Sequence, residues 1–314
     1  MTVIDLHTLK PISPPKECVL CLGNFDGIHI GHMALVKETL AQRDSLKAEF
    51  PDVKGGAWFF ARSPYDIITC NVTPRLTDVS QKLEIFASLG LDVAFIYDYE
   101  EVGGYSPDRF VSEILKEKCG CIFAVCGYNF KFGKGAAGDK STLYDLMGGR
   151  SLSVDQVCLD GKRICSSEIR RLISEGSVEE ANELLGRSYF IHGKVLHGKK
   201  LGRTIGIPTI NQGLSKDMAI PKNGIYVSRV FIGGKWFASV SNVGVRPSVE
   251  SNGAVNCETH ILGFDGDIYG KDVKVEFLAR LRDEIKFKSV DELRQQINKD
   301  VENTKIYFKK RQEA

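Results

Sequence analysis

The feature that most limits the fold of this chain is an alternation of short apolar runs with amphipathic segments over its first 186 residues. The runs CVLCLGNF (18–25), GAWFFA (56–61) and DVAFIYD (92–98) are each followed by a segment that reads as helical. Such alternation is typical of a parallel sheet with helices on both faces. We therefore predict an α/β domain over residues 1–186.

The pattern changes at about residue 187, where closely spaced β-rich runs replace the helical spacing. Segments such as YFIHGKVL (189–196) and GIYVSRVFI (224–232) are separated by Gly, Pro and Asn, which is typical of hairpins in an antiparallel barrel or sandwich. The last segment reads as a helix, because Ser289 and Glu292 have the spacing of a capping box. These features predict a second domain over residues 187–314.

Composition and charge narrow the class of protein. The net charge of +2 is too small to predict sequence-independent binding of nucleic acid. The N-terminal segment lacks the apolar core of a signal peptide, and no run of about 18 apolar residues is present to span a bilayer. Nine scattered cysteines argue against a disulfide framework, and Cys18 and Cys21 of the CxxC lie in a predicted strand on opposite faces. We expect a cytoplasmic protein without nucleic-acid or membrane partners, and a monomer or weak homo-oligomer.

The motif GNFDGIHIGH (23–32) lies between a predicted strand and a predicted helix. A helix N-terminus offers free backbone N–H groups and a positive dipole potential, which together bind phosphate. His29 and His32 are three residues apart, so both rings lie on one side of the first turn, and Gly31 leaves the backbone open. The residues expected to contact phosphate are Gly23, Asn24, Phe25, His29, Gly31 and His32. The alternative is a capped core helix with incidental histidines.

The letters His-Ile-Gly-His occur in class I aminoacyl-tRNA synthetases and, in close variants, in a wider set of nucleotidyltransferases. A synthetase also carries a lysine-rich loop of the Lys-Met-Ser-Lys-Ser type, and this sequence has none. In the corresponding place stands RICSSEIRRLISEG (163–176), whose hydroxyl and guanidinium groups can close over a triphosphate. The residues concerned are Arg163, Ser166, Ser167 and Arg170. Transfer of a nucleotide to a smaller acceptor is therefore favoured over the charging of tRNA.

A second candidate site lies in HGKKLGRTIGIPTIN (197–211). Gly198, Gly202 and Arg203 suit a loop that covers phosphates, although glycine and basic residues are common in hairpins. Thr209 and Asn211 are two apart in a predicted strand, so they share a face and offer oxygen ligands that Mg²⁺ accepts beside ATP. Taken alone, these two residues are more simply read as a strand-terminal Thr and a turn Asn.

Together these motifs resemble the bifunctional prokaryotic riboflavin kinase/FAD synthetase family, from about residue 15 to residue 310. The chain also has VCGYNFKFGKGAAGD (125–139), SNVGVRPS, ETHILGFDGDIYGK and LRDEIKF in the family's order. The resemblance implies a Rossmann-like nucleotidyltransferase domain, followed by an antiparallel β-barrel riboflavin kinase domain with a C-terminal helix. It implies that riboflavin is phosphorylated by ATP to FMN, and that FMN is then adenylylated by ATP to FAD, with release of pyrophosphate.

The resemblance implies roles for residues of the first domain. His29 and His32 hold the ATP phosphates, while Asn129 and Phe132 meet the flavin, Phe132 by stacking. No protein nucleophile is needed, because the FMN phosphate itself attacks. Catalysis then consists of alignment and charge neutralisation, with Mg²⁺ screening the oxygens. Taken alone, NFKFG reads as a turn between strands.

In the second domain the resemblance places the Mg²⁺·ATP ligands at Thr209 and Asn211. It assigns Glu258 as the general base, which suits a reaction in which the ribityl 5′-hydroxyl must lose its proton. Arg282 would lie near the flavin. Without the family, a strand glutamate is most simply a solvated residue.

Two departures from the family pattern leave an alternative open. Phe60–Pro64 reads Phe-Ala-Arg-Ser-Pro where the family usually has Phe-Asp-Pro-His-Pro, so Ser63 replaces a nucleotide-contacting histidine, and Arg62 can compensate by charge. Gly263 stands where the family typically has Asp. The alternative is a riboflavin kinase with a weak or differently specific nucleotidyltransferase domain. A non-catalytic flavin- or RNA-binding regulator is disfavoured, because it would need neither the histidine pair nor the base.

Overall fold

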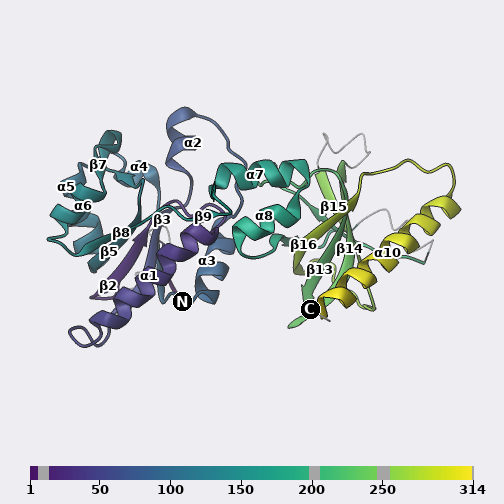
Figure 1. The fold of residues 1–314 in the computed structure, drawn as a ribbon, viewed down its shortest axis with the longest axis horizontal. Coiled ribbons are helices and arrows are strands. Elements are labelled where there is room, and N and C mark those ends of the chain that lie inside the picture. Colours follow the sequence, from purple (N-terminus) through teal and green to yellow (C-terminus); the bar gives the residue numbers. More distant parts are fainter. Residues whose placement is uncertain (6–13, 198–205, 246–254, 313–314) are drawn as a thin grey trace. The chain divides into compact units, whose positions relative to one another are not determined.

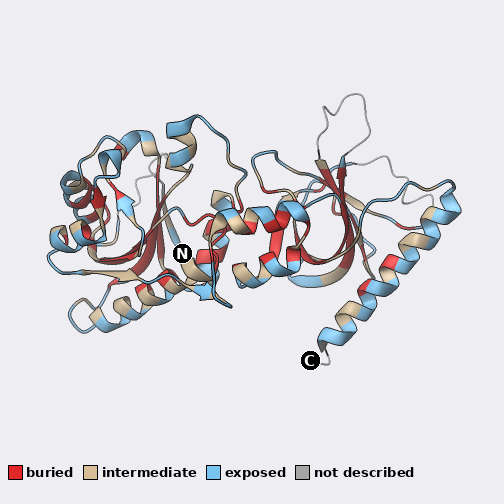
Figure 2. Ribbon diagram, turned by 45° about the horizontal axis from the view of Figure 1, so that its top comes forward, coloured by how far each residue is buried: buried red, intermediate tan, exposed pale blue. Residues whose placement is uncertain are grey.

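The computed structural model describes residues 1–5, 14–197, 206–245 and 255–312. Contacts divide the chain into two units, Met1–Ser166 and Ser167–Ala314. Each unit has its own sheet, and the strands of each sheet are mostly buried (Figure 1, Figure 2). Among the described residues, no helix combines the length and the apolar character needed to cross a membrane.

The N-terminal unit is built on a six-stranded sheet in the order β1-β4-β3-β2-β5-β8, in which every neighbouring pair is parallel. Its strands are β1 (Thr2–Asp5), β2 (Cys18–Leu22), β3 (Lys54–Phe60), β4 (Val93–Tyr97), β5 (Cys121–Gly127) and β8 (Ser151–Val154). Two short antiparallel pairs are β6 (Lys131–Phe132) with β7 (Gly138–Asp139), and β9 (Cys158–Leu159) with β10 (Lys162–Arg163). The predicted parallel sheet is confirmed.

Helices cover both faces of this sheet, as predicted. They are α1 (Ile30–Leu46), α2 (Pro64–Thr69), α3 (Val79–Ser88), α4 (Tyr99–Val102), α5 (Pro107–Arg109), η1 (Phe110–Lys118), η2 (Lys134–Ala136) and α6 (Lys140–Leu146). On one face, Cys18 lies in a core cluster with Ile114 of η1 and Leu143 of α6. On the other face, the thiol of Cys21 contacts the hydroxyl of Thr39 in α1. The two cysteines of the CxxC therefore point to opposite faces.

The C-terminal unit contains a six-stranded antiparallel sheet, in the order β11-β16-β13-β14-β15-β12, that forms a nearly closed barrel. Its strands are β11 (Tyr189–Lys194), β12 (Ile210–Gly213), β13 (Gly224–Ile232), β14 (Lys235–Val245), β15 (Val255–Ile261) and β16 (Asp272–Arg282). The two outermost strands approach each other, because Leu196 bridges to Asn211. The Gln212 amide reaches across this gap to the carbonyls of Gly193 and Val273, both at 2.8 Å. The predicted barrel is confirmed.

The barrel interior is partly polar. Ser228, Ser239, Ser241 and Thr259 are fully buried and hydrogen-bond to one another at 2.7–2.8 Å.

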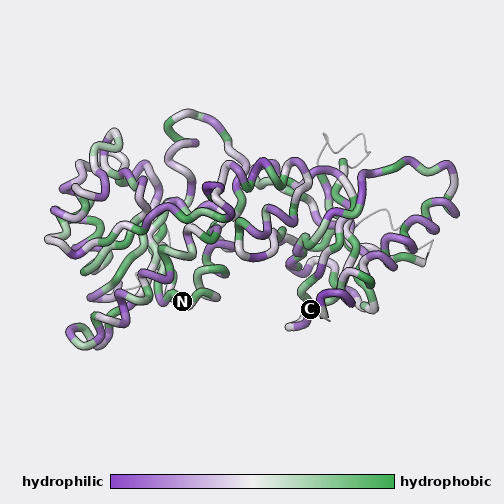
Figure 3. The backbone as a smooth tube through the Cα atoms, in the orientation of Figure 1, coloured by the Kyte–Doolittle hydropathy of each residue, from purple (hydrophilic) through white to green (hydrophobic). Residues whose placement is uncertain are grey.

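On the outside of the barrel, α10 (Val290–Gln312) lies against β13 and β14, which confirms the predicted C-terminal helix (Figure 1). Apolar residues are concentrated on the strands of both units (Figure 3). Alternate residues of the barrel strands therefore face a hydrogen-bonded interior and an outer surface.

Two helices that precede the barrel pack against it. They are α7 (Ser166–Glu175) and α8 (Val178–Leu185). The side chain of Asn182 donates to the carbonyl of Phe277 at 2.9 Å and accepts from the backbone N–H of Tyr189 at 2.6 Å. The contact division falls after Ser166, the first residue of α7, whereas the predicted domain boundary at residues 186 and 187 lies behind both helices. That boundary stays a prediction.

We predict that a fragment of residues 167–314 is more stable than one of residues 187–314. The shorter fragment loses the Asn182 hydrogen bonds and the buried side chains Val178 and Leu185, both 0% exposed. Removing two buried aliphatic contacts should cost roughly 3 kcal/mol or more. Urea unfolding followed by the fluorescence of Trp236 measures the difference. Equal midpoints in urea would show that α8 contributes nothing to the barrel.

Candidate active sites

The turn between β2 and α1 holds the first predicted motif in an uncommon backbone conformation. Phe25 (φ 51°) and Ile28 (φ 41°) lie in the left-handed region, which residues with side chains rarely adopt. The carboxylate of Asp26 accepts hydrogen bonds from the backbone N–H groups of Leu76 and Thr77, at 2.9 and 3.2 Å. The segment before α3 therefore fixes the turn from which α1 begins.

His29 and His32 form a stacked pair at the start of α1. Their ring centroids are 3.7 Å apart and their planes differ by 14°. His29 is the N-cap residue, and its Nδ1 accepts a hydrogen bond from the backbone N–H of His32 at 3.3 Å. Because Nδ1 accepts, the proton of the neutral His29 ring is on Nε2. A Cβ on Gly31 would lie 3.2 Å from the His29 ring, so glycine here also leaves room for the histidine pair.

Burial makes both imidazoles difficult to protonate. It lowers the pKa of His29 to about 4. It also lowers the pKa of His32 well below its ordinary value, and the nearby His29 and Lys82 lower that pKa further. The Nδ1 atom of His32 is buried and has no hydrogen-bond partner among the described residues. Near pH 7 both rings are therefore neutral, and they offer N–H donors rather than fixed positive charges.

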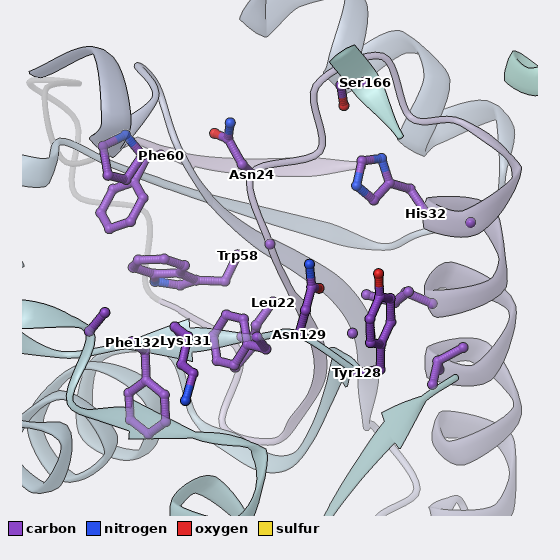
Figure 4. Close-up of a pocket in the computed structure, with 18 of the residues that line it drawn as sticks. Leu22, Asn24, His32, Trp58, Phe60, Tyr128, Asn129, Lys131, Phe132 and Ser166 are labelled. Carbon is purple, nitrogen blue, oxygen red and sulfur yellow. The ribbon is translucent and has the colours of Figure 1, made fainter. Parts of the chain in front are cut away.

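A cavity of about 570 Å³ lies beside the histidines, within the N-terminal unit. Figure 4 shows His32 and Ser166 at one end of it, and Trp58, Phe60 and Phe132 grouped at the other. The aromatic side chains pack together, with Trp58 and Phe60 edge to face at 4.8 Å between centroids. A cavity with a polar end and an aromatic end suits a ligand that has a phosphate chain and a flat ring system.

Most residues predicted for the first site line this cavity. They are Gly23, Asn24, His29, Gly31, His32, Asn129, Phe132, Arg163 and Ser166. The hydroxyl of Ser166 donates to the backbone carbonyl of Asp26 at 2.9 Å. The guanidinium of Arg163 lies 5.8 Å from the ring centre of Tyr128, which also lines the cavity. The structure thus brings together motifs that are more than 130 residues apart in sequence.

Three predicted residues are not in the cavity wall. Phe25 is fully buried, and its ring packs edge to face against His32 at 5.2 Å between centroids, so it supports the pair from behind. Ser167 and Arg170 belong to α7, in the second contact unit, and are not among the lining residues. Their contact with a nucleotide stays a prediction.

The segment Phe60–Pro64 borders the same cavity. Phe60 and Pro64 line it, whereas Arg62 and Ser63 are not among its lining residues. Arg62 is exposed, and Ser63 precedes α2 without forming a side-chain cap. The effect of this departure on the nucleotide site stays a prediction.

In the C-terminal unit, strand register brings three predicted residues into one row. Glu258 of β15 pairs with Asn211 of β12 on one side and with Asn242 of β14 on the other. Asn242 pairs with Ile225 of β13, which pairs with Arg282 of β16. Residues directly opposite on antiparallel strands share a face of the sheet. Glu258 is exposed and therefore lies on the outer face with Asn211 and Arg282.

A second cavity, of about 560 Å³, lies at the beginning of β12. Thr209 lines it together with Asp265 and Asp267. Asn211 is buried two residues further on, and its amide oxygen accepts a hydrogen bond from the Asn256 amide at 2.8 Å. The predicted residues Gly198, Gly202 and Arg203 lie outside the described residues.

Arg282 is fixed by α10. Its Nε and Nη2 donate to the two carboxylate oxygens of Asp300, at 3.1 and 2.6 Å. Asp300 is 2% exposed and also accepts from the Gln296 amide at 3.0 Å. This bidentate pair attaches the helix to the end of the row that contains Glu258. Contact between Arg282 and a flavin stays a prediction.

The sequence reasoning did not identify several residues of these sites. Trp58 and Phe60 form the aromatic end of the first cavity, and the run Trp-Phe-Phe at the end of a predicted strand was the available signal. Asn242 lies next to Glu258, and its side-chain oxygen is buried without a hydrogen-bond partner among the described residues. Lys82 of α3 reaches the histidine turn, for which the sequence offered no signal.

Comparison with known proteins agrees with this two-part arrangement. Residues 12–168 match the family model of FAD synthetase, and residues 185–308 match that of riboflavin kinase. The bifunctional riboflavin kinase/FMN adenylyltransferase of Bacillus subtilis is 31% identical to the chain, over 96% of this chain and 98% of the relative. The chain belongs to this family. The Haemophilus influenzae member is 34% identical, over 93% and 95% of the two chains.

A solved structure shares the fold of the whole chain. It is described as a macrolide-efflux protein from Streptococcus pneumoniae, with a TM-score of 0.84 and 28% identity, over 97% of this chain and 99% of that one. That description concerns the other protein, and the similarity to the present chain is one of fold. Membership of the riboflavin kinase/FMN adenylyltransferase family, predicted from the motifs, is confirmed.

We predict that the buried histidines make the N-terminal domain sensitive to acid. The pKa of His29 has its ordinary value of 6.5 in the unfolded chain and is about 4 in the folded protein. Between these two pH values the unfolded chain therefore binds more protons than the folded protein. Stability should therefore fall as the pH falls from 6.5 to 4. Replacement of His29 by Asn keeps a good N-cap residue and removes the titrating ring, so that variant should lose less stability in this window.

Thermal unfolding followed by the fluorescence of Trp58 measures this effect. Trp236 is the second of the two tryptophans, and its replacement by Phe in both proteins restricts the signal to the N-terminal domain. Parallel loss of stability in the two proteins between pH 6.5 and 4 would contradict a buried, neutral His29.

Proposed function

We propose that this chain phosphorylates riboflavin to FMN in its C-terminal domain and adenylylates FMN to FAD in its N-terminal domain. The observation that carries the proposal is the cavity with a histidine pair at one end and an aromatic wall at the other, in the part matched by the FAD synthetase family. ATP is the second substrate of both reactions. The riboflavin kinase match and the row that contains Glu258 support the first reaction.

In adenylyl transfer, an FMN phosphate oxygen attacks the α-phosphorus of ATP and the bond to pyrophosphate breaks. The role of the protein is to align the two phosphates and to stabilise charge on the leaving group. We assign this role to the backbone N–H groups at the start of α1 and to the N–H donors of His29 and His32. Arg163 and Ser166, at the same cavity, complete the phosphate end.

The aromatic end of the cavity suits the flavin of FMN. Phe132 packs against Phe130 with ring planes 16° apart, next to Trp58 and Phe60 in the cavity wall. A flat isoalloxazine stacks favourably on such rings. Asn129 supplies an amide beside them, which can donate to or accept from the polar edge of the flavin.

In the kinase reaction, the 5′-hydroxyl of riboflavin attacks the γ-phosphorus of ATP, and ADP leaves. We assign Glu258 to accept the hydroxyl proton, since it is an exposed carboxylate on the outer face of the barrel. The cavity lined by Thr209 is the candidate site for the nucleotide phosphates, and Gly198, Gly202 and Arg203 remain candidates for a covering loop. The row that joins Asn211, Glu258 and Arg282 then aligns acceptor and donor.

The donor chemistry at the start of β12 fits Mg²⁺. Thr209 and Asn211 offer a hydroxyl oxygen and an amide oxygen, which are the kinds of oxygen ligand that Mg²⁺ accepts. Among the described residues, no group of three His, Cys, Asp or Glu side chains is placed to hold a metal. A magnesium ion would therefore be held largely by ATP and water, where it neutralises charge on the transferred phosphate. Location in the cytoplasm, and a monomeric or weakly associated state, stay predictions.

We predict that Glu258→Gln lowers FMN formation and spares FAD formation from supplied FMN. The amide keeps the shape of the side chain and removes the base, which should cost about 10²–10⁴-fold in rate. Chromatographic separation of riboflavin, FMN and FAD after incubation with ATP and Mg²⁺ measures both products. Glu302→Gln, at an exposed position of α10, is the matched control and should leave both rates unchanged. An unchanged FMN rate would remove Glu258 from this role.

The converse is expected for His32→Ala. Loss of one preorganised donor to a developing phosphate charge should lower FAD formation by roughly 10²–10³-fold, while FMN formation continues. The same chromatographic assay measures both rates. His192→Ala, an exposed histidine on β11, is the control. Equal loss of both products in the His32 variant would refute two separate sites.

A further inference from the structure

A lysine is buried behind the phosphate end of the first cavity. Lys82, in the first half of α3, is only 4% exposed. Its Nζ donates to the backbone carbonyl of Asn24 at 2.8 Å and lies 5.1 Å from the ring centre of Phe59. Burial lowers the pKa of this ammonium to about 8, against the opposing influence of Asp26. A buried charge of this kind is costly and requires specific partners.

The contact of Lys82 is with the turn that carries the nucleotide motif. Asn24 lines the cavity, one residue after Gly23 and five before His29. The same segment that leads into α3 holds this turn twice more, since Asp26 accepts from the N–H of Thr77 and the N–H of Gly27 donates to the Thr77 hydroxyl. The residues that lead into α3, together with Lys82 in α3, thus fix the position of the turn and place a positive charge beside it.

The charge of Lys82 also reaches the histidines. It is one of the influences that lower the pKa of His32, so its positive potential extends to the N-terminus of α1. In a buried setting this potential is weakly screened, and an anion at the helix N-terminus would experience it strongly. Lys82 is not among the residues lining the cavity, so it acts through the turn rather than by contact.

We propose that Lys82 is a positioning residue for adenylyl transfer, which holds the Asn24 carbonyl in place and supplies a buried positive charge behind the ATP phosphates. This inference rests on the proposed function of the N-terminal site. It assigns to α3, which carries none of the recognised motifs, a part in binding ATP. The protonated form is the active one, because only the ammonium carries the charge.

The charged and titratable groups around Lys82 come from three elements. Asp26 lies in the turn, Arg75 and Asp78 precede α3, and His32 lies on α1. Lys82 itself has a pKa near 8, whereas the pKa of His32 is far lower. As the pH rises through about 8, the free enzyme loses the Lys82 charge, so kcat/KM for ATP should fall. Bound ATP favours the ammonium, so kcat should fall only at higher pH.

The test compares Lys82→Met and Lys82→Arg in the full-length protein. FAD formation from FMN and ATP is measured at varied ATP, and FMN formation from riboflavin reports the integrity of the other domain. Lys82→Met should lower kcat/KM for ATP by about 10- to 100-fold, the range for loss of a hydrogen bond to a charged group, with FMN formation unchanged. Lys82→Arg should retain more activity and lose the decline of kcat/KM near pH 8.

Two outcomes would overturn the inference. One is a Lys82→Met protein that unfolds like wild type and keeps its kcat/KM for ATP. The other is a decline in kcat/KM near pH 8 that is the same in wild type and in Lys82→Arg. This second comparison tests the inference even where the Lys82→Met protein does not fold. A wild-type protein that makes FMN but no FAD would instead refute the proposed function of the N-terminal site.

Discussion

The hydrogen bonds of Asp26 are the interaction on which the N-terminal site depends. Its carboxylate accepts from two backbone N–H groups ahead of α3, and its carbonyl accepts from the hydroxyl of Ser166. Three segments far apart in sequence meet at this one residue. A turn with two side-chain-bearing residues in the left-handed region is not favoured by local preference, so it persists because such contacts determine it. The direction of α1, and therefore of its free N–H groups, follows from that turn.

The C-terminal site depends instead on strand register. Side chains alternate between the two faces of a strand, so a slip of one residue would move Glu258 from the outer face to the interior. The buried hydroxyl groups of Ser228, Ser241 and Thr259 oppose such a slip, because each would lose a hydrogen-bond partner while its side chain is buried in the native structure. A polar interior in this barrel thus fixes the position of a catalytic candidate on the opposite face.

Much of this architecture was predictable because it repeats short-range patterns. Strand–helix alternation predicted the parallel sheet with helices on both faces, and dense turn residues predicted the antiparallel barrel. The strand–turn–helix context predicted that His29 and His32 lie together, and their rings do stack. The roles of Glu258 and Arg282 came only from the family resemblance, because no spacing within one strand can indicate which residues of four other strands lie beside it.

The residues that sequence reasoning missed are those whose meaning is set by tertiary contacts. A lysine in an amphipathic helix normally faces water, and nothing in the local sequence distinguishes Lys82, which is buried beneath a turn 58 residues away. Trp58 reads as a core residue from its strand pattern, and it is one, but the core at that point borders a cavity. For Ser167 and Arg170 the sequence predicts contact with a triphosphate, whereas their contacts place both residues in the barrel unit, so their role stays a prediction.

The charge state of the first site follows from the burial of its three titratable side chains, His29, His32 and Lys82. Two neutral imidazoles and one buried ammonium surround the start of α1, and burial lowers the pKa of each. Every one of these groups carries less positive charge than it would in water. An anion beside them would favour their protonated forms, because an opposite charge raises the pKa of each group.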